Sequence, residues 1–158
     1  MTKSWVCVLH FSPLKGSISF LSLPGADYNR AYIDVKDAQW SCKGDLVPVD
    51  INQISPSQFV VYRFGVFIIN FLHKAIDTPE VTLLLASNLP QNNYEKNCFR
   101  HSFFYQHAKR VLFVRQERME SIGDFILVLV HCLAHIKIDD LTDDANPMFL
   151  RNFYKVSL

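Results

Sequence analysis

Residues 121–138 read SIGDFILVLVHCLAHIKI, and they combine a helix start, a long apolar run and two histidines. Ser121 can cap a helix, and Asp124, three residues on, is suited both to a capping box and to the positive end of the helix. The apolar run that follows predicts a helix from Ile122 to about Ile138. Within it, His131 and His135 are four residues apart, so both imidazoles are expected on one face, about one turn apart.

A second long helix is predicted upstream of this stretch, from Pro56 to about Ala75. Ser55 can cap it, Pro56 suits the first helical position, and Gln58 completes a capping box. Apolar residues cover most of its circumference, which is typical of a helix buried at the centre of a domain. We therefore expect a buried central helix with the histidine-bearing helix packed against it.

The remaining segments have the patterns of strands and turns. Strands are expected at residues 5–11, 17–23, 31–35, 81–86, 102–105 and 111–115, and a short last helix at 147–154. Asp45–Ile51 contains Pro48, so it is expected as an edge strand or a loop. The predicted fold class is α+β with a mixed sheet, in a single domain over residues 1–158 with a strand-rich front part, 1–54, and a helix-strand-helix part, 55–158.

Composition excludes several classes of protein. With 49% hydrophobic residues and 13 phenylalanines the chain is not disordered. The formal charge of +1 supplies no overall field for nucleic acid or an anionic membrane. The most apolar run, Phe125–Ile136, is shorter than the ~20 residues of a membrane span.

The cysteines and the first residues indicate the compartment. The four cysteines are widely spaced, without a C-x-x-C pair, and the first residues lack the apolar core of a secretory signal. We therefore expect reduced thiols in a cytoplasmic or nuclear protein.

The two histidines carry the one pattern that suggests chemistry. Imidazoles one helical turn apart can share a tetrahedral zinc ion. The stretch from Leu129 to Ile136, LVHCLAHI, resembles the zinc-binding helix of zincin metallopeptidases, which carry H-E-x-x-H. The order of elements over Ser55–Ile138 is similar as well: a long helix, a strand, a loop, two strands and the histidine helix. The resemblance implies a zincin-like fold and a zinc ligand pair, His131 and His135.

The chain departs from that family in two places. The catalytic glutamate, which activates the metal-bound water, falls at Cys132. The third histidine of the metzincins falls at Leu141, and no glutamate follows Glu120 to serve as the third ligand of the gluzincins. A third ligand would have to be Asp139, Asp140, Asp143 or Asp144, of which Asp139, one turn beyond His135, is the expected one. Two core histidines bound to the backbone or to a carboxylate are the alternative.

These observations predict a non-catalytic, zincin-like domain that acts in protein interaction or scaffolding within a larger intracellular protein. It would be a pseudoenzyme without a cofactor and without a membrane segment. One alternative is a divergent zinc-dependent hydrolase that uses His131, His135 and a downstream aspartate. Another is a nucleic-acid-binding module in the basic region 96–118, where aromatic residues alternate with cations. Its expected contacts are Arg100, Lys109, Arg110 and Arg115.

Overall fold

The structure is a computed structural model that describes residues 44–157, and only the backbone of Ser157. The strands expected at residues 5–11, 17–23 and 31–35 lie outside the described residues. Within the described part, three α-helices and a mixed four-stranded sheet confirm the α+β class. The helices are α3 (Pro56–Ile76), α4 (Ile122–Ile138) and α5 (Pro147–Ser157), and the strands are β1 (Val47–Pro48), β2 (Thr82–Asn88), β3 (Phe103–Gln106) and β4 (Val111–Arg115).

The sheet has the strand order β1-β2-β4-β3. β2 and β4 are parallel, with Thr82 opposite Val111, whereas β1 and β3 pair antiparallel with their neighbours. β4 lies between β2 and β3, and its residues Leu112, Phe113 and Val114 are buried on both faces of the sheet. The short β1, with Pro48, forms the edge of the sheet, as its proline predicts.

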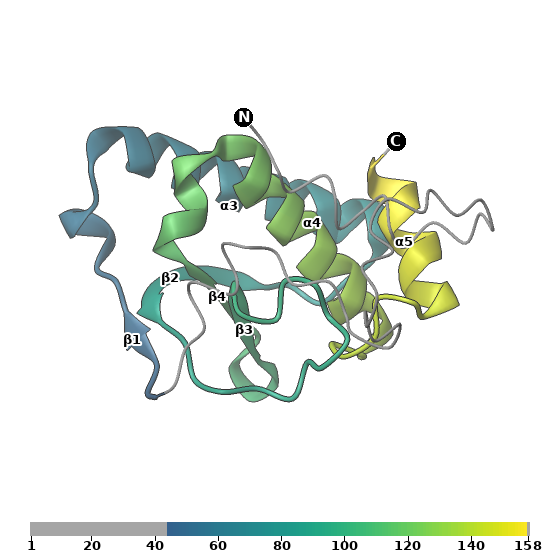
Figure 1. Cartoon of the computed structure of the whole chain (residues 1–158). Helices are drawn as coiled ribbons and strands as arrows, with labels where there is room; N and C mark the ends of the chain where they lie inside the picture. The colour runs from purple at the N-terminus through teal and green to yellow at the C-terminus, as the bar shows by residue number, and fades with distance from the viewer. Residues whose placement is uncertain (1–43, 158) are drawn as a thin grey trace, which may run out of the picture.

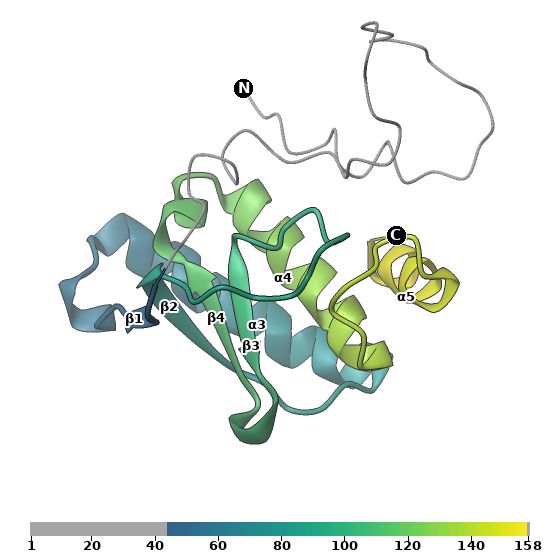
Figure 2. The same ribbon diagram turned by 60° about the horizontal axis from the view of Figure 1, so that its bottom comes forward.

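The two long helices lie together on one face of the sheet (Figure 1). α5 packs beside the C-terminal part of α4, which the rotated view makes plain (Figure 2). α3 and α4 approach closely at Gly65, where an added Cβ would lie 2.5 Å from Cε1 of Phe125. A residue without a side chain is therefore required where the two helices meet.

Local signals in the sequence set the helix ends. Ser55 accepts a hydrogen bond from the amide of Gln58, whose side chain in turn accepts from the amide of Ser55, so the predicted capping box is confirmed. Ser121 caps α4 by accepting from the amide of Asp124 at 3.3 Å. The helix ends at Ile138, because Asp139 adopts a left-handed conformation with φ of 56°.

The expectation that α3 is buried all round is wrong. Tyr62, Gly65, Ile69, Leu72 and Ile76 form its buried face. The opposite face exposes five large apolar side chains, Phe59, Val60, Phe64, Phe67 and Phe71. The physical reason is that α4 and the sheet cover only one side of this helix within the described residues.

α3 also has the length and composition of a membrane-spanning helix, and it is the one such helix among residues 44–157. It has 21 residues, and 28% of its most apolar window is buried inside the domain. Length and composition alone are weak evidence for a span, since the core helices of soluble proteins pass the same test. α3 differs from such core helices because most of this window is exposed, while its buried face packs against α4.

Candidate metal centre

Four side chains from three segments meet beneath α5. His131 and His135 project from α4 toward one carboxylate oxygen, Oδ1 of Asp144, with their Nε2 atoms at 3.0 and 2.7 Å. Sγ of Cys98, in the loop between β2 and β3, lies 3.7 Å from Nε2 of His131. All four residues are at most 5% exposed. The fold thus gathers one thiol, two imidazoles and one carboxylate in the interior.

Backbone pairing between two loops brings Cys98 and Asp144 together. The amide of Lys96 donates to the carbonyl of Thr142 at 3.0 Å, and Asn97 donates from its side chain to the carbonyl of Leu141 at 3.0 Å. The amide of Cys98 then donates to Oδ2 of Asp144 at 2.8 Å. This bond holds the carboxylate so that its other oxygen, Oδ1, faces the histidines.

The two imidazoles differ in their surroundings. Nδ1 of His135 contacts the carbonyl oxygen of Asp140, and its ring lies against Phe149. His131 contacts the rings of Phe99 and Phe149 edge-on, and its Nδ1 is buried without a hydrogen-bond partner. His135 is therefore held at both nitrogens, whereas His131 is held at Nε2 and by aromatic packing.

The charge state of the cluster follows from these contacts. Burial acts to raise the pKa of Asp144, but the charge of His131, the contacts with both imidazoles and the hydrogen bond from the Cys98 amide outweigh it. The pKa of Asp144 is therefore held well below its usual range, and the carboxylate is ionised. Burial, followed by the charge of Asp144, raises the pKa of the Cys132 thiol well above its usual range. Cys132 is thus a neutral thiol within the core.

The expected ligand Asp139 is not brought to the histidines. Its left-handed conformation at the end of α4 turns its side chain outward, where it is 85% exposed and 3.5 Å from Nδ1 of His107. Asp140 bonds to Thr142 and Asn146, and Asp143 lies 3.7 Å from the amine of Lys96. Asp144, the last of the four aspartates considered from the sequence, is the one that reaches both imidazoles.

Sequence reasoning missed Cys98. It lies 33 residues before His131 in a polar loop, and no spacing pattern connects the two. The one usable signal was the residue type itself, because a buried thiol is also a good metal ligand. Cys98, His131 and Asp144 can each offer a ligand atom within 4.8 Å of the other two.

The four cations expected to contact nucleic acid do not form one group. Lys109 and Arg110 are exposed at the turn that connects β3 to β4. Arg115 is buried at the opposite end of β4, where it donates to Glu117 and to the carbonyl of Ser87. Arg100 precedes β3, near that same end, and donates to His101.

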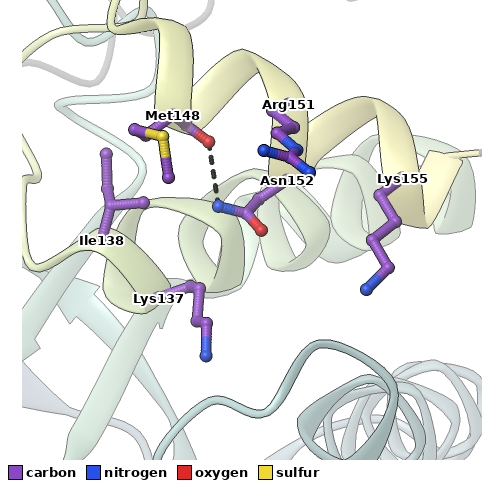
Figure 3. A pocket seen from close by; sticks show the side chains of 6 residues that line it. All are labelled: Lys137, Ile138, Met148, Arg151, Asn152 and Lys155. Atoms are coloured by element: carbon purple, nitrogen blue, oxygen red, sulfur yellow. Dashed lines mark hydrogen bonds between the residues drawn. The ribbon is translucent and has the colours of Figure 1, made fainter.

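A second basic region lies between α4 and α5. A hollow of about 490 Å³ is lined by Lys137, Ile138, Met148, Arg151, Asn152 and Lys155 (Figure 3). The amine of Lys137 is already bonded to the carbonyl and carboxylate oxygens of Asp77. None of the residues that line the hollow belongs to the histidine cluster, so the hollow is separate from it.

α5 covers the cluster with its inner face. Phe149 and Phe153 are buried against the histidines, whereas Met148 and Arg151 on the same helix face outward.

Comparisons with protein-family models, with curated proteins and with solved structures gave no match for the chain.

Proposed function

We propose that the chain is a non-catalytic, zincin-like domain that binds another protein within a larger intracellular protein. One observation carries this proposal, the exposed apolar stripe of α3, which we define as Val60, Phe64, Phe67 and Phe71. Their exposed fractions are 66, 42, 59 and 60%. Large apolar side chains that are exposed side by side mark interaction surfaces.

The stripe has the geometry of a surface that receives a helix. Its residues are spaced by four, three and four positions, which aligns them along one side of α3. The rings of Phe64 and Phe67 are stacked with centroids 6.2 Å apart, and those of Phe67 and Phe71 with centroids 6.3 Å apart. This arrangement matches the apolar side of an amphipathic helix, packed along α3.

The charges beside the stripe indicate the chemistry of the partner. α3 carries Arg63 and Lys74, both exposed, and contains no aspartate or glutamate. Acidic residues that flank the apolar side of the partner helix would complement these cations and set its register. We therefore propose an amphipathic helix with acidic flanks as the partner.

The histidine cluster supports the non-catalytic part of the proposal. Cys132 stands where the zincin glutamate would be, and its neutral thiol is a poor general base. Phe149 and Phe153 lie over His131 and His135, so a peptide has no access to them in this conformation. A hydrolase would need both a base and an entry path.

The structure gives no support to the nucleic-acid alternative. Lys109 and Arg110 lie at one end of the β3–β4 pair, whereas Arg100 and Arg115 lie at the other end.

Photo-cross-linking from the stripe tests the proposed partner. A photoreactive amino acid replaces Phe67 in the full chain expressed in cells, and the cross-linked peptides are identified by mass spectrometry. We expect an amphipathic helical segment of another protein with acidic flanks. The matched control carries the same photoreactive residue at Met148, which is 54% exposed on α5 and should not capture that segment. Cross-links confined to residues 1–43, to a second copy or to lipid would overturn the proposal.

A separate assay tests the absence of catalysis. The purified full chain is incubated with zinc and a mixture of unstructured peptides, and the products are analysed by mass spectrometry. No cleavage above the buffer blank is expected. Cleavage that a chelator stops, and that His131→Ala abolishes, would show that the chain is a hydrolase.

A further inference from the structure

We propose that Cys98, His131, His135 and Asp144 bind one zinc ion as a closed structural site. The site takes two ligands from α4 and one from each of two loops. Cys98 and Asp144 have no counterpart in the zinc-binding pattern that the chain resembles. The inference does not depend on the partner proposed for the α3 stripe.

Three of the four ligand atoms are already gathered as a zinc ion requires, since Cys98, His131 and Asp144 each offer an atom within 4.8 Å of the other two. Bonds of ~2.0 Å to nitrogen and oxygen and ~2.3 Å to sulfur place neighbouring ligand atoms roughly 3.3–3.6 Å apart. Here Sγ of Cys98 is 3.7 Å from Nε2 of His131, and that nitrogen is 3.0 Å from Oδ1 of Asp144. Nε2 of His135 lies 2.7 Å from the same oxygen. Nε2 of His135 lies outside this group of three, so the ion must draw the His135 ring inward to complete the tetrahedron.

The atoms that surround the two ring nitrogens of His135 indicate a bound cation. Its Nδ1 faces a carbonyl oxygen, which only accepts, so that nitrogen must carry the proton. In a neutral imidazole Nε2 then presents a lone pair to Oδ1 of an ionised carboxylate, and the two would repel each other. A bound zinc ion turns both lone pairs into bonds, without an extra proton on a ring that is 0% exposed.

The surroundings orient two of the ligands, His135 and Asp144, as metal sites require. Metal-binding histidines usually donate their second N–H to a carbonyl or carboxylate, and His135 does so to the carbonyl of Asp140. Metal-binding carboxylates are also oriented by hydrogen bonds, and the Cys98 amide does this at Oδ2 of Asp144.

The donor set selects zinc over other common ions. Calcium and magnesium require several oxygen ligands, whereas one sulfur, two nitrogens and one oxygen suit zinc. Four protein ligands leave no position for a water molecule or a substrate, which distinguishes a structural site from a catalytic one.

Metal analysis of the full chain is the first test. The protein is expressed with zinc in the medium, purified and analysed by mass spectrometry for metals. We expect about one zinc per chain, and we expect chelation to lower the melting temperature and zinc, but not calcium, to restore it. Less than about a tenth of a zinc per chain, with no change in melting temperature on zinc addition, would overturn the inference.

Cobalt substitution tests the ligand set. The Co²⁺ form of the full chain should show the visible bands of tetrahedral cobalt and a thiolate-to-cobalt charge-transfer band. Cys98→Ala should abolish the charge-transfer band and weaken metal binding by more than about 100-fold, since even the loss of a supporting hydrogen bond costs 10–100-fold.

Cys132→Ala is the matched control, because Cys132 is equally buried and lies between the two histidines in the same helix. It should retain the charge-transfer band. Octahedral cobalt spectra, or loss of the band in Cys132→Ala and not in Cys98→Ala, would contradict the assignment. The spectrum of the unaltered chain decides the question of thiolate ligation even if a variant fails to fold.

Discussion

The ring of Phe149 lies flat against the imidazole of His135, with centroids 3.9 Å apart and 17° between their planes. Phe149 belongs to α5, and His135 to α4. Through this contact, together with the packing of Phe153 on Phe149, α5 separates the histidine cluster from solvent. The last helix of the domain therefore decides whether the cluster is an interior feature or an open cleft.

We predict that Phe149→Ala destabilises the domain by about 3–5 kcal/mol, the usual cost of removing a buried phenylalanine. The change removes the apolar cover of His135 as well as the packing of α5 on α4. Urea denaturation of the full chain measures the free energy of unfolding. Met148→Ala, on the exposed side of the same helix, is the control and should change it by less than about 0.5 kcal/mol. Equal effects of the two substitutions would show that α5 does not pack as described.

Gly65→Ala should destabilise the domain by about 1–3 kcal/mol, although alanine favours helices over glycine by ~1 kcal/mol. An added methyl group would lie 2.5 Å from Phe125, whose ring is fully buried, and 3.0 Å from Leu129. Gly123→Ala in the first turn of α4 is the matched control, because its new Cβ would meet nothing closer than 3.9 Å. It should be neutral or stabilise the domain. Stabilisation by both substitutions in thermal unfolding would rule out the close approach of α3 and α4.

Asp144→Asn should cost about 3 kcal/mol of stability, because it removes the charged ligand that links both buried histidines to the proposed zinc ion. A neutral amide is a weaker zinc ligand than a carboxylate and does not offset the charge of the ion. Asp139→Asn is the control, since the Asp139 carboxylate is exposed beyond the end of α4, and it should leave the unfolding free energy within about 0.5 kcal/mol. If chemical denaturation showed that Asp139→Asn lowers the unfolding free energy more than Asp144→Asn does, Asp139 would be the partner of the histidines.

The stability of the domain should fall at alkaline pH in a way that depends on Tyr94. Burial raises the pKa of this phenol to about 12, and its hydroxyl accepts from the amide of Tyr105. An unfolded chain ionises tyrosine near pH 10, so the contribution of Tyr94 is fully present below pH 10 and is lost between about pH 10 and 12.

Between pH 8 and pH 11, the unfolding free energy of the Tyr94→Phe variant should therefore fall by about 1 kcal/mol less than that of the unaltered chain. Denaturant titrations at the two pH values measure this difference between the variant and the unaltered chain. The comparison cancels the titration of lysines and of other tyrosines. Parallel losses in the two proteins would mean that Tyr94 is accessible to solvent in the native state.

Local signals were sufficient to predict most of the described elements. The limits of α4 agree with the prediction, and α3 ends one residue later than expected, at Ile76. Serine caps, a proline at the first helical position and the apolar period all act within a few residues, so the chain itself reveals them. The edge position of Pro48 is of the same kind, since a missing amide donor is a property of one residue.

What surrounds an element could not be predicted from its own pattern. The apolar circumference of α3 predicted complete burial, yet Phe67 and Phe71 are exposed. Periodicity reports which side chains are apolar, but the number of neighbours that cover them depends on the layers of the fold.

The sequence by itself determined the limits of the helices, the spacing of His131 and His135 and the absence of a glutamate between them. Only the tertiary structure decided that Cys98 and Asp144 complete the cluster and that Asp139 does not. The physical reason is the range of the interactions involved. A helix fixes the relation of residues four apart through its own hydrogen bonds, whereas Cys98 and Asp144, 46 residues apart in the chain, meet only because two loops pair across the fold.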